Sequence, residues 1–154
     1  MEKLFRKSYL LVVLVLTGCF SKEPTSIKSS SKTSSTISTS VASYDDVKDK
    51  MIYWSNIFAI DDDDYYVYFF SKTCTHCQNL KSFIVEQAMS RGDIYFVEAS
   101  DQDIFLKDVS ITIGLTSIEG FGILGYPSLV KIVEKTITKN MAGIPSIRSE
   151  LLIE

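Results

Sequence analysis

The chain has 154 residues, of which 45% are hydrophobic and 23% charged, with a net charge of −3 at pH 7 and three cysteines. This length suits one ordinary domain with appendages and is too short for two large domains. The composition is neither that of a disordered chain nor that of a collagen, and three cysteines cannot form a disulfide scaffold. The acidic balance argues against a protein that binds nucleic acid by neutralising phosphates, so we expect no nucleic-acid partner.

Residues 1–18 have the features of an export signal. Lys3, Arg6 and Lys7 give a positively charged start, and residues 9–16 form an unbroken apolar run. The run is far shorter than the ~20 residues that a membrane-spanning helix needs. We therefore predict a signal peptide over this segment.

The end of this segment, Leu16-Thr17-Gly18-Cys19, resembles the lipobox of bacterial lipoproteins. In that family the cysteine is acylated, palmitate being one such acyl group, and the chain is cut just before it. The resemblance implies that Cys19 becomes a lipidated N-terminus, and several acyl chains on one residue anchor a protein firmly. We expect a lipid-anchored protein at the cell membrane that faces the extracytoplasmic side. An ordinary secretory signal with an incidental cysteine is the alternative.

Residues 19–44 are predicted to be a flexible tether. The stretch 21–40 consists almost entirely of Ser, Thr and Lys and shows no apolar periodicity, which is typical of a spacer. The domain that follows, residues 45–154, is acidic, with ten Lys and Arg against seventeen Asp and Glu. The contrast favours a basic tether near an anionic membrane surface, although a plain soluble linker explains the same composition.

The first elements expected in this domain are a helix, a turn and a strand. Residues 45–58 are predicted to form a helix. Its apolar residues recur at helical spacing: Val47, Met51, Trp54 and Phe58. The four aspartates at 61–64 indicate a solvated turn, with a calcium site as a less favoured alternative. The dense aromatic run at 65–70 predicts a buried strand.

The second part of the domain predicts two further strand and helix units. Residues 74–92 carry apolar side chains at helical spacing up to a terminal glycine, and 94–98 read as a strand. The segment 100–120 is expected to contain turns or short helices. A hairpin is predicted over 128–141, with its turn at Glu134-Lys135, and a terminal helix over 146–154. The inward residues expected in that helix are Ile147, Leu151 and Leu152. This alternation predicts a mixed α/β sheet.

Cys74 and Cys77 lie three residues apart at the predicted junction of strand and helix. Such a pair can close a short disulfide within the first helical turn. The sulfur of Cys74 would lie at the helix N-terminus, where free backbone N–H groups favour a thiolate. Since the thiolate is the species that attacks a disulfide, this pattern predicts a nucleophile at Cys74 and a resolving thiol at Cys77.

The two residues between the cysteines refine this prediction. His76 would stabilise the Cys74 thiolate further and thereby favour the reduced pair, which makes the couple a stronger oxidant. Thr75 is too small to block the approach of a substrate.

Two less reactive alternatives compete with redox chemistry. A structural disulfide is possible, but so short a loop contributes only about 2 kcal/mol or less to stability. A metal could be held by Cys74, His76 and Cys77, yet no other histidine and no second cysteine pair is present to complete four ligands. We therefore predict no metal and no cofactor.

The segment 68–77 resembles the active-site strand and helix start of the thioredoxin-fold superfamily, and 121–130 is similar to its segment that ends in a cis-proline and the next strand. The resemblance implies an α/β fold, a three-layer sandwich with a mixed central sheet and flanking helices. It also implies a cis peptide bond at Pro127, preceded by Tyr126, with this backbone beside Cys74. There an exposed edge would pair with a substrate peptide.

The resemblance covers about residues 44–154 and has departures. The histidine before the second cysteine, His76, is shared with protein disulfide isomerases and periplasmic disulfide-forming oxidases. The buried aspartate six residues before the first cysteine of thioredoxin is Tyr68 here, so that proton-transfer group is missing. Glu98, on the neighbouring strand, is a candidate substitute. The first strand of the usual fold is not evident.

Together these features predict an extracytoplasmic thiol–disulfide oxidoreductase that acts through Cys74 and Cys77, with an oxidase or isomerase direction favoured. Its partners would be thiols and disulfides of exported proteins and an unidentified redox partner. We expect a monomer. The alternative is a non-catalytic accessory lipoprotein, for example in peptide or bacteriocin export or in metal delivery.

Overall fold

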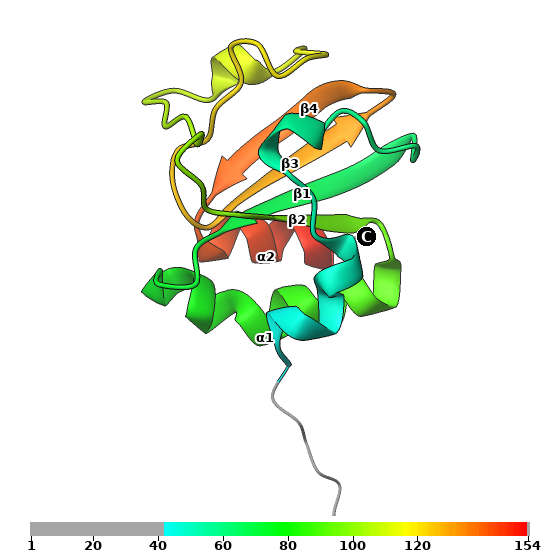
Figure 1. Cartoon of the computed structure of the whole chain (residues 1–154), viewed down its shortest axis with the longest axis vertical. Helices are drawn as coiled ribbons and strands as arrows, with labels where there is room; N and C mark the ends of the chain where they lie inside the picture. The colour runs from blue at the N-terminus through cyan, green and yellow to red at the C-terminus, as the bar shows by residue number, and fades with distance from the viewer. Residues whose placement is uncertain (1–41, 154) are drawn as a thin grey trace, which may run out of the picture. The chain divides into compact units, whose positions relative to one another are not determined.

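The computed structural model describes residues 42–153 (Figure 1). The predicted signal peptide, nearly all of the predicted tether and Cys19 lie outside the described residues. The elements in chain order are the 3-10 helices η1 (Tyr44–Lys50) and η2 (Trp54–Asn56), strand β1 (Asp64–Phe70), helix α1 (Thr75–Arg91), strand β2 (Ile94–Glu98), 3-10 helix η3 (Ser110–Thr112), strands β3 (Ser128–Val133) and β4 (Thr136–Ala142), and helix α2 (Ile144–Leu152). No helix within this range is long and apolar enough to cross a membrane.

The four strands form one mixed sheet in the order β2-β1-β3-β4. Strand β1 is parallel to β2 and antiparallel to β3, and β3 and β4 form an antiparallel hairpin. Residues 65–70 of β1 are all buried, because β1 is an inner strand whose two faces are both covered. The strands predicted at 65–70 and 94–98 are confirmed.

One face of the sheet is covered by helices. In Figure 1, α1 and α2 both lie below the sheet. The side chains of Tyr66, Tyr68 and Phe70 alternate with those of the opposite face and pack into a core with these helices and η1. The helical residues buried in this core are Cys77, Leu80, Ile84, Val85, Ala88, Ile147 and Leu151.

The opposite face is covered mainly by irregular chain. Tyr65, Val67 and Phe69 of β1 contribute to a second core. Trp54 of η2 packs there, with its ring centroid 5.3 Å from that of Phe69 and 5.0 Å from that of Phe121. The third layer of the sandwich is therefore supplied by η2 and by residues preceding β3.

The single helix predicted over 45–58 is wrong. The backbone of Val47 (φ −122°, ψ 24°) is not helical, and the chain forms two short 3-10 helices. Between them Met51 forms a parallel bridge with Phe96, and the Ile52 N–H donates to the Phe96 carbonyl at 2.8 Å. Pairing with the edge of β2 thus interrupts the helix. In place of the first strand of the usual thioredoxin fold, which the sequence does not show, the chain forms this single bridge.

Helix α1 and the hairpin follow the sequence prediction. Cys74 is the N-cap of α1, and Gly92 ends the helix in a left-handed conformation (φ 82°). Glu134 and Lys135 have φ values of 47° and 61°, so the β3–β4 turn has the left-handed backbone typical of a two-residue hairpin loop.

Helix α2 begins two residues earlier than predicted, and one of its expected inward residues is wrong. Ile147 and Leu151 are buried, but Leu152 is 64% exposed. Since consecutive helical residues point about 100° apart, Leu152 is turned away from the face that holds Leu151. Glu150 also connects the helix to the sheet, because Tyr66 donates to its carboxylate at 2.9 Å.

The segment between β2 and β3 contains η3 and several turns, and it is attached to the sheet. The Gly114 N–H donates to the Ile137 carbonyl and the Ile137 N–H to the Leu115 carbonyl, at 2.8 and 2.9 Å. These bonds cover part of the outer edge of β4, which would otherwise offer free backbone groups. The segment ends at Tyr126-Pro127, whose peptide bond is cis, as predicted.

The strand order and directions, the cysteine pair at the start of α1 and the cis-proline before β3 together make this a thioredoxin-like α/β fold, as predicted.

Candidate active site

The turn between β1 and α1 holds Cys74 in place. The Cys74 N–H donates to the Ser71 carbonyl at 3.2 Å, and the Thr73 N–H donates to the Ser71 hydroxyl at 3.3 Å. The Gln78 side chain, one turn into α1, donates to the Lys72 carbonyl at 2.8 Å. A hydrogen-bonded turn on the end of a buried strand therefore fixes the position of the first cysteine.

The Cys74 sulfur lies between a helix N-terminus and the cis-proline loop. It accepts the Cys77 N–H at 3.3 Å, as an N-cap side chain does. Its own thiol donates to the Tyr126 carbonyl at 3.6 Å. Cys74 is half-buried and both cysteines are free thiols. A thiolate here would keep the backbone N–H as a donor at the positive end of α1.

Cys77 has very different surroundings. Its side chain is fully buried, and burial raises the pKa of the Cys77 thiol to about 12, with the hydrogen bond to Cys74 acting in the same direction. The Ser71 backbone and the Tyr68 hydroxyl act in the opposite direction and lower this pKa in part. Cys77 is therefore held as a neutral thiol behind an accessible Cys74.

Two tyrosines line the buried side of the pair. Tyr44 of η1 donates its hydroxyl to the Cys77 carbonyl at 3.2 Å, and its ring stacks on Phe70 at 4.0 Å. Tyr68 of β1 is fully buried. Burial raises the pKa of Tyr44 to about 12 and that of Tyr68 well above its usual value. Sequence reasoning noted the tyrosine at 68 but missed Tyr44, which lies in the segment predicted to be tether.

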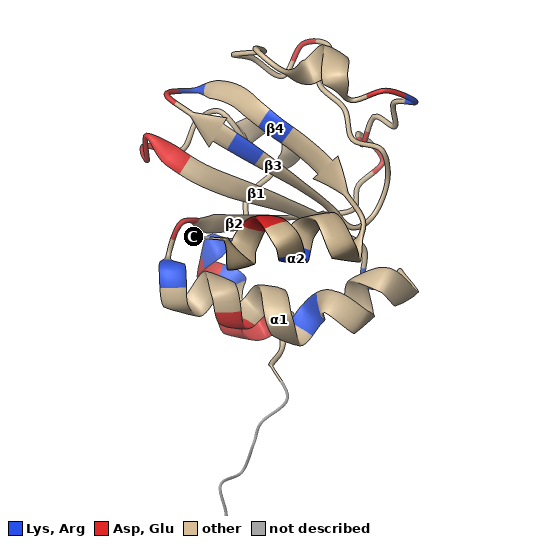
Figure 2. Cartoon of the chain, turned by 180° about the vertical axis from the view of Figure 1, so that it is seen from behind, with Lys and Arg blue, Asp and Glu red and all other residues tan. Residues whose placement is uncertain are grey.

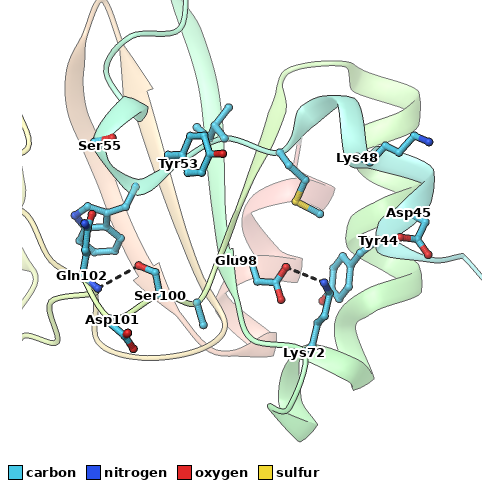
Figure 3. A pocket seen from close by; sticks show the side chains of 14 residues that line it. Tyr44, Asp45, Lys48, Tyr53, Ser55, Lys72, Glu98, Ser100, Asp101 and Gln102 are labelled. Carbon is cyan, nitrogen blue, oxygen red and sulfur yellow. Dashed lines mark hydrogen bonds and ion pairs between the residues drawn. The ribbon is translucent and has the colours of Figure 1, made fainter.

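Glu98 does not face the cysteine pair. Its carboxylate forms an ion pair with Lys72 at 2.8 Å, on the surface, and it is not among the groups that shift the pKa of Cys77. The dashed line between Glu98 and Lys72 in Figure 3 marks this pair, on the wall of a groove of about 900 Å³. Neither cysteine lines that groove.

The other predicted site residues lie around Cys74. Thr75 and His76 are exposed on the first turn of α1. His76 lines a small groove of about 390 Å³ together with Tyr126 and Pro127. Pro127 itself is buried, and its carbonyl accepts the Gly143 N–H at 2.9 Å. The accessible part of the cis-proline loop is therefore Tyr126.

An apolar surface adjoins this loop, and sequence reasoning did not assign it. Phe105 is 57% exposed, and its ring meets that of Tyr126 edge to face at 5.5 Å. It forms a parallel bridge with Ile123, next to exposed Leu124. We call Ile104, Phe105, Leu124 and Tyr126 the apolar shelf. The signal in the sequence is the apolar run at 104–106, with an acidic residue before it and a basic one after it.

Two chain segments approach each other closely beneath the shelf. At Gly122 a Cβ atom would lie 2.6 Å from Cγ of Leu106, so only glycine allows the two chain segments to approach this closely. The start of α1 at 73–80 and the loop at 120–130 contain no Lys, Arg, Asp or Glu, as Figure 2 shows for the ribbon. The two segments that meet at Cys74 are thus uncharged in an otherwise acidic domain.

Among residues 42–153, no group of three or more His, Cys, Asp and Glu is arranged to hold a metal ion.

Comparisons with known proteins find similarity among solved structures alone. No family model and no curated protein matches the chain. The solved structures that are similar include thioredoxin f2 of Chlamydomonas reinhardtii (18% identity, 67% of this chain and 91% of that chain, TM-score 0.43), a Plasmodium falciparum thioredoxin (14%, 67% and 96%, 0.45) and the short form of spinach chloroplast thioredoxin f (13%, 67% and 91%, 0.45). At such identities and scores, the activity has to be judged from the residues of this chain.

Proposed function

We propose that this protein is a thiol–disulfide oxidoreductase in which Cys74 exchanges with the substrate and Cys77 resolves. The observation that carries the proposal is the asymmetry of the pair. Cys74 is accessible and accepts a backbone N–H at the start of α1, while Cys77 is buried directly behind it as a neutral thiol. A structural disulfide would not need one accessible sulfur at a helix N-terminus.

In the oxidising direction, a substrate thiolate attacks Cys74 of the oxidised pair. The bond between Cys74 and Cys77 breaks, a mixed disulfide forms, and Cys77 leaves as a thiolate that takes up a proton. A second substrate thiolate then attacks the substrate sulfur of the mixed disulfide and releases Cys74. The substrate loses two electrons to the cysteine pair, and a disulfide of a redox partner reoxidises the pair. Reduction of a substrate follows the same steps in reverse.

The preferred substrate is a polypeptide. Tyr126 presents its backbone beside the Cys74 sulfur, and the apolar shelf continues from the Tyr126 ring. An extended segment with apolar residues next to its cysteine would cover this surface, whereas a small thiol would touch only the sulfur. Phe105 and Leu124 would then contribute to affinity without taking part in the chemistry.

The place of action that we propose is outside the cell membrane, with the protein anchored through a lipid on Cys19. The support is the run of charge, apolar residues and lipobox-like motif at 1–19. Growth with labelled palmitate tests this, with Cys19→Ala as the comparison. Palmitate label that remains on Cys19→Ala would contradict lipidation at Cys19.

For the direction, we propose oxidation or isomerisation, because His76 beside the pair favours the reduced form of Cys74 and Cys77. The reduction potential decides this point. A value near about −270 mV, as in thioredoxin, would contradict it, and a value nearer the about −120 mV of strong oxidases would support it.

The activity itself is tested with Cys77→Ser in full-length protein. Without the resolving thiol, the mixed disulfide between Cys74 and the substrate accumulates, and it appears as a higher band on a non-reducing gel that collapses on reduction. Cys74→Ser is the matched control and should trap nothing. Failure of Cys77→Ser to form any mixed disulfide with a disulfide-bonded test polypeptide, whose disulfide the Cys74 thiolate attacks, would refute the proposal.

A further inference from the structure

The Tyr68 hydroxyl is a buried polar group without a partner. Its oxygen has no hydrogen bond within the described part of the chain, and the residue is fully buried. Such groups are rare because burying a hydroxyl without a hydrogen bond is unfavourable. By contrast, the buried hydroxyl of Tyr65, on the other face of the same strand, donates to the Ile57 carbonyl at 2.8 Å. The unpaired state of Tyr68 therefore requires an explanation.

Two atoms near this hydroxyl can accept its hydrogen. One is the Tyr44 hydroxyl oxygen, whose own hydrogen is committed to the Cys77 carbonyl at 3.2 Å. The other is the sulfur of Cys77, which belongs to the same buried cluster as Tyr68. The hydroxyl of Tyr68 also lowers the pKa of that thiol. The ionisable groups that act on Tyr68 are Tyr44, Cys77 and Cys74.

No carboxylate or amine from the described residues acts on Cys77 or Tyr68. The other elements packed against them contribute apolar side chains to the same core, namely Phe70, Leu80, Phe96, Leu129, Ile147 and Leu151. Among residues 42–153, the ionisable neighbours of Cys77 in this corner of the core are therefore Tyr44, Tyr68 and Cys74, and none of them is a carboxylate or an amine.

Building on the function proposed above, we propose that Tyr68 is a positioning residue for the resolving thiol, which donates its hydroxyl hydrogen to the Cys77 sulfur when that sulfur is a thiolate. A neutral thiol is a weak acceptor and a thiolate a strong one. The hydroxyl is thus unpaired in the resting reduced protein and becomes paired as charge develops on Cys77. Because this hydrogen bond forms only as charge develops on the Cys77 sulfur, it accelerates the step in which Cys77 attacks or leaves. It does not stabilise the resting reduced protein.

The step balances without a protein base. In resolution, Cys77 loses its proton and attacks Cys74 of the mixed disulfide. The bond between Cys74 and the substrate breaks, the Cys74–Cys77 disulfide forms, and the departing substrate sulfur takes up the proton. In the oxidising direction Cys77 is the leaving group, and the same hydrogen bond stabilises it as it departs. Tyr68 remains protonated in both directions, because burial raises its pKa well above the usual value.

The test follows two phases of one reaction in the reduced protein. With excess dithiobis-nitrobenzoate, Cys74 releases a first coloured thiolate, and Cys77 releases a second when it resolves the mixed disulfide. Tyr68→Phe should leave the first rate unchanged and slow the second about threefold. This value assumes that the Cys77 pKa rises by about one unit, which lowers the thiolate fraction about tenfold and raises thiolate nucleophilicity about threefold. Tyr65→Phe, which also removes a buried hydroxyl, should change neither rate.

Two further readouts separate this role from a structural one. Tyr68→Phe removes an unpaired hydroxyl, so its melting temperature should equal or exceed that of the wild type. The second rate should rise with pH in both proteins, because Cys77 must lose its proton. A second phase as fast as in wild type, a slowing of both phases with lower stability, or a wild-type second rate independent of pH would each overturn the proposal. Absence of the first phase in wild type would instead refute the proposed function.

Discussion

The two cysteines of this protein lie one helical turn apart and differ in almost every physical respect. Cys74 is partly exposed, and its sulfur lies between the Cys77 N–H and the carbonyl of Tyr126, a residue of the apolar shelf. Cys77 is fully buried among aromatic and aliphatic side chains, and its pKa is raised to about 12. The same functional group is thus reactive toward other molecules at one position and protected from them at the other.

The difference shows how one short motif serves two chemical roles. The Cys74 sulfur accepts a backbone N–H at the start of α1, whereas the tertiary core closes over Cys77 and desolvates its sulfur. A disulfide exchange enzyme needs this asymmetry, because two accessible thiolates would leave the order of attack undefined. Substitutions at and around the two cysteines test this difference.

The largest expected effect is that of Cys74→Ser. It removes the only accessible sulfur of the pair, so disulfide exchange with a polypeptide should fall by at least about a thousandfold, a loss typical of removing a covalent nucleophile. Insulin reduction and oxidative refolding of a reduced protein measure this. A rate of disulfide exchange in Cys74→Ser equal to that of the wild type would show that Cys77 reacts with substrates directly. Burial would then not protect Cys77.

The rate of alkylation of Cys77 measures directly how far the fold suppresses the reactivity of its thiol. In Cys74→Ser, Cys77 should react with iodoacetamide at pH 8 about sixtyfold more slowly than in the urea-unfolded variant, and the rate should still rise with pH above pH 9. This value combines a thiolate fraction about 2,400-fold smaller with a thiolate nucleophilicity about fortyfold higher. The reason is that a thiol with a pKa of about 12 is almost entirely protonated at pH 8, whereas an unfolded cysteine is about a quarter thiolate. A rate in the folded variant that levels off below pH 9 would contradict the raised pKa.

His76→Ala should change the surroundings of Cys74 and leave those of Cys77 unchanged. We expect the reduction potential of the pair to fall by about 30 mV, which corresponds to a tenfold change in the equilibrium constant for a two-electron couple. Equilibration with glutathione, read from the thiol content, gives this value. Thr75→Ala is the neighbouring control. A potential that is unchanged or higher in His76→Ala would remove the support for an oxidising direction.

The smallest effect is expected from the apolar shelf. Phe105→Ser should slow exchange with a polypeptide substrate about fivefold, because part of one aromatic side chain no longer contacts it. The rate with dithiobis-nitrobenzoate should stay the same. Ile111, which is 64% exposed and outside the shelf, provides the control Ile111→Ser. Equal losses in both variants, or a loss with the small disulfide, would argue against a polypeptide contact at Phe105.

Local patterns in the sequence were sufficient for most of the fold and for the reactive motif. The aromatic run of β1, the apolar spacing of α1 with its terminal glycine, and the two-residue turn of the hairpin each depend on neighbouring residues, and all are present. The helix predicted over 45–58 failed because Met51 pairs with Phe96, a contact between residues far apart in the chain. Local periodicity cannot report such a competing interaction.

Strand, turn and helix signals surround the Cys-x-x-Cys pair, so its position at the start of a helix follows from local sequence. The groups that each sulfur faces come from distant parts of the chain. Tyr44 reaches Cys77 from η1, and Phe105 reaches Tyr126 from the β2–β3 segment. Burial, and with it the pKa of Cys77, depends on which distant segments cover a residue. That property belongs to the packed chain and not to any stretch of its sequence.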